Sequence, residues 1–77
     1  MSLDSHQRDP LSLIAALTAT ERQILSALVQ GRSIKSIAMM LSLPLDETES
    51  ARDVLMEKLS ARTVADAVRI GLLARIQ

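Results

Sequence analysis

The side chains with the clearest capacity for chemistry in this sequence are carboxylates along one side of a predicted helix over residues 46–59. Spacings of three and four residues place side chains on the same side of a helix. The polar residues of that side and of the first turn are Asp46, Glu47, Glu49, Ser50, Asp53 and Glu57. A carboxylate can accept a hydrogen bond from cytosine N4, but several carboxylates together repel DNA phosphates. This side therefore predicts a surface for a partner, and both DNA and protein remain candidates.

The opposite side of the same helix has the spacing of a core-facing stripe. Its residues are Thr48, Ala51, Arg52, Leu55 and Leu59. Acidic residues in a first turn also offset the helix dipole, which accounts for the carboxylates at the start of the helix. The dipole does not account for Asp53 and Glu57, because like charges four residues apart cost a few tenths of a kcal/mol. Ordinary solvation of an exposed face is the alternative for these two.

Groups that would support catalysis or metal binding are scarce in the sequence. His6 is the only histidine, no cluster of ligands surrounds it, and there is no cysteine. A single ligand cannot build a metal site, and no nucleophile accompanies a base in the manner of a catalytic site. The sequence predicts no enzyme activity, no metal and no cofactor.

Two further surface features lie close to the acidic helix in the sequence. Arg32 and Lys35 stand at the start of a predicted helix over residues 34–42, where they can contact phosphates or only face solvent. Met39 and Met40 lie in the same helix. Single exposed apolar residues are ordinary and methionine fills gaps well, but a methionine pair beside an acidic stripe also suits an adaptable protein-binding surface. Both interpretations stay open.

Length and composition restrict the chain to one small helical domain. It has 77 residues, no aromatic residue, no cysteine, two glycines and two prolines, so the core must consist of aliphatic side chains and methionine. The formal net charge is zero, which removes the domain-wide basic footprint of many DNA-binding proteins. No apolar run could span a membrane, and the lack of cysteine fits a cytoplasmic protein. We expect residues 1–9 to form a disordered tail and residues 10–77 the folded domain.

The first helices have recognisable start signals. Asp9 followed by Pro10 is typical of a helix start, here of a short helix over residues 10–16. Thr18 and Glu21 form a capping box, in which each side chain binds the other residue's backbone amide. A second helix is therefore predicted to begin directly after Thr18.

The later helices have similar signals. Gly31 ends the second helix, and Ser33 caps the third. Asp46 with Glu49 predicts a second capping box at the acidic helix, and Thr63 caps the last helix.

Apolar spacing within these helices predicts the core. The inward positions are Leu25, Leu28, Ile37, Leu41, Leu55, Leu59 and Val68. In the last helix the core stripe consists of Val64, Val68, Gly71 and Leu72. An apolar strip of Ile70, Leu73 and Ala74 lies on its other side.

A short helix, a tight turn and an amphipathic helix within residues 33–59 have the layout of a helix-turn-helix. Over about residues 17–76 the sequence resembles the LuxR/FixJ-type helix-turn-helix domain of bacterial transcription regulators. The residues that carry the resemblance are Leu17, Thr18, Glu21, Gly31, Lys35, Ile37, Ala38, Leu41, Lys58, Leu59, Ala65 and Ala67. The resemblance implies an all-α fold, a four-helix LuxR-type domain, here with a short extra N-terminal helix. The family's third helix enters the DNA major groove and its fourth often forms the dimer contact.

The sequence departs from the family pattern in the helix that would enter the groove. Where the family has Ser-Pro-basic-Thr-Val, residues 44–48 are PLDET. Glu49 and Asp53 stand where many members carry basic residues, and Met39 and Met40 stand where the family commonly carries charge. We also expect the chain to lack the receiver or ligand-binding domain that normally precedes such a module.

Two functions follow from the residues and the resemblance together. The first is a small transcription regulator that binds double-stranded DNA weakly through the acidic helix, with Lys35 near phosphates. The second is a helix-turn-helix derivative that no longer binds DNA and contacts another protein. The strip of Ile70, Leu73 and Ala74 and the resemblance predict a homodimer through the last helix. The alternative is that the short first helix, with Leu11, Leu13 and Ile14, covers the strip within one chain.

Overall fold

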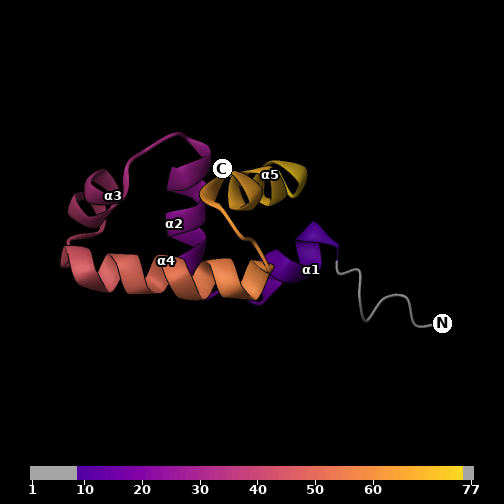
Figure 1. Cartoon of the computed structure of the whole chain (residues 1–77), viewed down its shortest axis with the longest axis horizontal. Coiled ribbons are helices and arrows are strands. Elements are labelled where there is room, and N and C mark those ends of the chain that lie inside the picture. The colour runs from indigo at the N-terminus through magenta and orange to yellow at the C-terminus, as the bar shows by residue number, and fades with distance from the viewer. Residues whose placement is uncertain (1–8, 76–77) are drawn as a thin grey trace.

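The computed structural model describes residues 9–75, and these residues form helices without any strand (Figure 1). The helices are α1 (Pro10–Ala15), α2 (Ala19–Val29), α3 (Ile34–Leu41), α4 (Leu45–Leu59) and α5 (Val64–Leu73). The all-α prediction with a short extra N-terminal helix is confirmed. His6 and the tail predicted over residues 1–9 lie outside the described residues, except for Asp9. Within residues 9–75, no helix has the length and apolar character needed to cross a membrane.

Local capping residues begin most of the helices where the sequence predicted. The Asp9 carboxylate accepts a hydrogen bond from the Ser12 amide at 2.8 Å, at the start of α1. Thr18 and Glu21 form the reciprocal capping box at α2, with both bonds near 3 Å: 3.1 Å to the Thr18 hydroxyl and 2.9 Å to the Glu21 carboxylate. The side chains of Ser33 and Thr63 likewise cap α3 and α5. These four starts depend only on residues within one helical turn.

The predicted capping box at α4 is wrong. The N-cap is Pro44, which has no side-chain oxygen to offer, and α4 already begins at Leu45. Asp46 therefore lies inside the first turn, where its carboxylate accepts from the Glu47 amide at 2.9 Å. Pro44 stands in extended backbone with a φ of −58°, which suits proline and lets the helix start earlier than the Asp46 signal indicated. The acidic first turn then complements the helix dipole in place of a cap.

The core is aliphatic and is supplied by four of the helices. Leu25, Leu28, Ile37, Leu55 and Leu59 are buried, as predicted. Leu41 and Val68 are only partly buried and pack at the edge of the core, so the prediction that these two would be buried was wrong. Ile24 and Ala27 of α2 are also buried, because α2 contacts α3, α4 and α5 and so buries a wide face.

The core-facing side of α5 agrees with the prediction only in part. Gly71 is buried, as predicted, and so is Ala67, whereas Val64 is 41% exposed and Leu72 is 59% exposed. Small residues at a helix contact let the two helix axes approach closely, and α5 makes its most extensive packing against α2. Hydrophobicity favoured the larger side chains for the core, but close packing selected the small ones.

α4 is the longest helix and contacts each of the other four, and in Figure 1 it runs below α2, α3 and α5. The short α3 lies near the N-terminal end of α4, and α1 lies near its C-terminal end. α5 contacts α1, α2 and α4. The two ends of α4 therefore have different surroundings.

Candidate helix-turn-helix interface

The turn between α3 and α4 is tight because Ser42 adopts a left-handed conformation, with φ 57° and ψ 42°. The Leu43 amide donates to the Ala38 carbonyl at 3.0 Å, which closes the last turn of α3. Such a conformation usually belongs to glycine or asparagine at a helix C-terminus. α3, this turn and α4 thus form a helix-turn-helix unit.

Thr48 fixes the first turns of α4 against the core. It is fully buried, and its hydroxyl donates to the Pro44 carbonyl at 2.9 Å. The Thr48 amide donates to the same carbonyl at 3.0 Å. Because the hydroxyl finds its partner within its own helix, a polar residue can occupy this inward position without an unsatisfied group.

The outward side of α4 is acidic, as the spacing predicted. Asp46, Glu47, Ser50, Asp53 and Glu57 are all exposed, and we call these five residues the acidic face. Glu49 is partly buried, unlike these five residues, so it contributes less to this surface than predicted. Val54 is the exposed apolar residue beside it, at 42% exposure. Among residues 9–75, no group of histidine or acidic side chains could hold a metal ion.

Both basic side chains of α4 form ion pairs within the domain. The Arg52 guanidinium lies 3.3 Å from the Asp53 carboxylate, although Asp53 keeps 71% of its side chain exposed. The Lys58 ammonium lies 2.8 Å from a Glu21 carboxylate oxygen and 3.5 Å from the Ala16 carbonyl. The acidic face is therefore accompanied by little free positive charge from its own helix.

The Glu21–Lys58 pair connects the start of α2 to the end of α4. Burial of Glu21 raises the pKa of its carboxyl, but hydrogen bonds from Lys58 and from the Thr18 amide outweigh this effect. The net result is a Glu21 pKa below that of an ordinary glutamate, so the carboxylate stays charged at neutral pH. Both residues belong to the family resemblance, but no spacing in the sequence pairs them, because they lie 37 positions apart.

The predicted surface residues of α3 are exposed. Lys35 faces solvent, and the Arg32 guanidinium just ahead of α3 lies 3.5 Å from the Ser36 hydroxyl. Met39 is 79% exposed and Met40 is 48% exposed. The methionines thus lie on the surface and do not fill the core.

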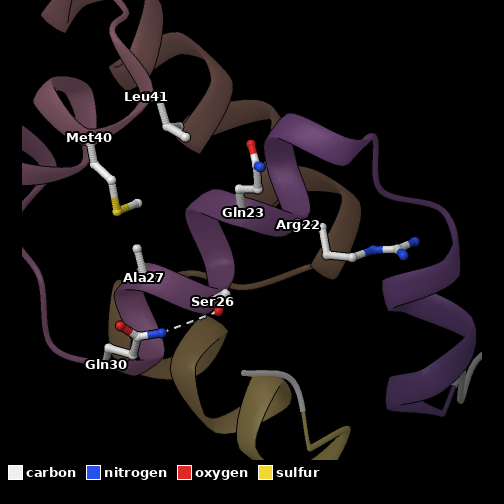
Figure 2. Close-up of a pocket in the computed structure, with 7 residues that line it drawn as sticks. All are labelled: Arg22, Gln23, Ser26, Ala27, Gln30, Met40 and Leu41. Carbon is white, nitrogen blue, oxygen red and sulfur yellow. Dashed lines mark hydrogen bonds between the residues drawn. The ribbon is translucent and has the colours of Figure 1, made fainter.

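Met40 also borders an open hollow between α2 and α3, which the sequence did not predict (Figure 2). The hollow has a volume of about 380 Å³. Its polar border comes from α2 and its apolar border mainly from α3, with Arg22, Gln23, Ser26, Ala27, Gln30, Met40 and Leu41 as lining residues. Because the lining residues come from two helices, no pattern within one helix predicts this hollow.

The strip predicted for dimerisation is partly covered within the chain. Ile70 packs against the core and Ala74 is partly buried, while Leu73 is 62% exposed. α1 contacts α5, and Leu13 and Ile14 of α1 pack against the core. Leu11 remains 68% exposed. Leu73 is therefore the strip residue most available for a contact between chains.

The fold and this unit define the protein as a helix-turn-helix domain. Residues 15–70 match the family of bacterial regulatory proteins called the luxR family, and the chain belongs to that family. The chain is 38% identical over 63 residues to the transcriptional regulatory protein FixJ of Azorhizobium caulinodans. This similarity covers 82% of the chain but only 30% of the relative, so the chain spans about a third of the length of the protein it matches. No solved structure matches the chain.

Proposed function

We propose that this chain acts in transcription regulation through its helix-turn-helix unit, with double-stranded DNA as a weak ligand. Family membership and the likeness to a transcriptional regulatory protein support the regulatory role and a cytoplasmic location. We infer the weak affinity for DNA from the charge of α4. Its outward side is acidic, and its two cations already have carboxylate partners.

DNA affinity depends largely on the number of phosphates that basic side chains neutralise. The acidic face offers none, so the phosphate contacts fall to Arg32 and Lys35 near the start of α3, both of which are exposed. A carboxylate such as Asp53 can still accept from cytosine N4. The domain can therefore still contact bases, although it lacks most of the nonspecific attraction to DNA phosphates.

A fluorescence anisotropy titration against random duplex, at low and at moderate salt, tests this proposal. The wild-type domain should bind measurably at low salt but no better than a neutral control protein at physiological salt. Asp53→Lys changes that position from −1 to +1 and also releases Arg52, so salt-sensitive binding should appear. The matched control is Gln23→Lys/Gln30→Lys, which adds the same charge on α2 and should bind no better than wild type. Wild-type binding with a steep salt dependence would overturn the weak-ligand proposal.

The proposal includes a homodimer through the side of α5 that carries Ile70, Leu73 and Ala74. The exposed Leu73 supports it, and a dimer would place two helix-turn-helix units on paired half-sites. Sedimentation at high micromolar concentration and moderate salt should show a dimer for wild type and a monomer for Leu73→Asp. A wild-type monomer under those conditions would leave α1 as the cover of the strip and would remove the paired half-sites.

A second candidate function is protein binding without DNA, and the hollow between α2 and α3 favours it. Met40 on its border and the nearby Met39 give an apolar, adaptable surface. The transcript profile of a strain without this protein, complemented with each variant, separates the two functions. Loss of regulation with Met39→Asp/Met40→Asp but not with Lys35→Ala supports protein binding, and the reverse pattern supports DNA contact.

A further inference from the structure

We infer that the acidic face of α4 binds the outward side of α5 from a second copy of the chain. The outward side of α5 consists of Arg62 just ahead of the helix, then Ala65, Arg69 and Leu72, and we call these four residues the basic face. All four are exposed, with Arg69 at 66% of its side chain. This contact goes beyond the proposed regulatory function. On α5 it faces away from Ile70 and Ala74 of the strip, although Leu73 lies one turn from Arg69, at the border of the basic face.

The two faces complement each other in charge. The acidic face presents Asp46, Asp53 and Glu57 to solvent, with Asp53 71% exposed beside its partner Arg52, and the basic face presents Arg62 and Arg69. Asp66, a carboxylate close to the basic face, already accepts a hydrogen bond from the Arg62 amide at 3.3 Å. It lies 3.8 Å from the Arg69 guanidinium, a long distance for an ion pair, so Arg69 keeps most of its charge available.

The apolar content of the two faces also agrees. Each face adds an exposed apolar residue beside its charges: Val54, at 42% exposure, and Leu72, at 59%. The contact thus combines ion pairs with a small apolar area.

Within residues 9–75, no ion pair joins the two faces of one chain. α4 and α5 pack against each other and the core through their opposite sides, which bury Leu55 and Leu59 on α4 and Ala67 and Gly71 on α5. Both charged faces are consequently left for another molecule. A second copy supplies the complementary face, and the zero net charge of the chain imposes no overall repulsion between copies.

Exposed ion pairs are individually weak and are screened by salt. The association should therefore appear at high micromolar concentration in low salt and disappear at moderate salt. A dimer through the apolar Leu73 strip behaves differently, because apolar contacts persist at moderate salt. The salt-sensitive part of the association consequently reports the contact between α4 and α5.

Sedimentation equilibrium of the full chain at low and moderate salt tests the inference, with circular dichroism to check folding. Asp53→Arg and Arg69→Glu should each weaken the salt-sensitive association about fivefold or more, roughly 1 kcal/mol. An equimolar mixture of the two variants should recover it, because the mixture retains one intact acidic face and one intact basic face. Gln23→Lys/Gln30→Lys carries the same net charge as Asp53→Arg but leaves both faces unchanged, so it should stay within about twofold of wild type.

Three results would overturn the inference. The first is a wild-type chain whose mass does not depend on salt. The second is an equal loss of association in the Gln23→Lys/Gln30→Lys control, which would assign the effect to net charge. The third is a mixture that associates no better than its two components.

Discussion

The two ends of α4 are held in different ways. At the C-terminal end, Leu55 and Leu59 are fully buried and Lys58 forms an ion pair with the buried Glu21. At the N-terminal end, Thr48 is the buried residue, the N-cap Pro44 offers no side-chain bond, and Leu45 is 39% exposed.

This difference separates the residues that position the helix from those that face a partner. Lys58 and Leu59 are among the residues that resemble the family, and they hold the C-terminal end in place. The departures from the family pattern at this helix are residues 44–48, Glu49 and Asp53, which all precede Leu55 and mostly face outward. A helix can therefore keep its position in the fold while its outward surface changes charge.

The largest expected effect is at the buried end. Leu55→Ala should lower the free energy of unfolding by about 2–5 kcal/mol, because it leaves a cavity in the aliphatic core. Urea unfolding followed by circular dichroism measures this. The neighbouring Val54→Ala is the matched control, since Val54 is 42% exposed and should cost about 0.5 kcal/mol or less. Similar losses in the two variants would contradict the placement of α4.

The next effect concerns the ion pair at the same end. Lys58→Met should cost about 1–3 kcal/mol, because it leaves the buried Glu21 carboxylate without its cation. Arg52→Met is the control on the same helix. Its partner Asp53 is 71% exposed, so the loss there should be about 0.5 kcal/mol or less. An Arg52→Met variant as unstable as Lys58→Met would remove the contrast between the two pairs.

The same pair predicts a dependence of stability on pH. The pKa of Glu21 is lower in the folded chain than in an ordinary glutamate. The pair therefore stabilises the fold above the ordinary glutamate pKa, and this contribution is lost as pH falls through the lower, folded pKa. The stability difference between wild type and Lys58→Met should shrink in that acidic range, as unfolding curves at several pH values would measure. A difference that stays constant from neutral to acidic pH would contradict the role of Glu21.

The smallest effect is at the partner-facing end. Pro44→Ser adds a side-chain cap to α4 but loses the rigidity of proline, and these changes oppose each other. Pro44→Ala loses the rigidity without adding a cap. Pro44→Ser should therefore be more stable than Pro44→Ala by about 1 kcal/mol in thermal unfolding. Equal stabilities would mean that the acidic first turn of α4 already satisfies the free amides.

The sequence by itself determined the helical class, the helix starts at Asp9, Thr18, Ser33 and Thr63, and the outward acidic side of α4. These features depend on residues within one or two helical turns, so spacing and side-chain type are enough to predict them. The family resemblance also pointed to the correct fold, which the match over residues 15–70 confirms.

Only the tertiary structure decided which side of α5 faces the core and which groups pair across the domain. Ala67 joins the predicted Gly71 on the inward side because α5 lies close to α2, and the apolar spacing within α5 does not specify that distance. Glu21 meets Lys58 because α2 and α4 bring together positions that are far apart in sequence. Interactions between distant segments depend on the packing of whole helices, and that packing is a property of the folded chain.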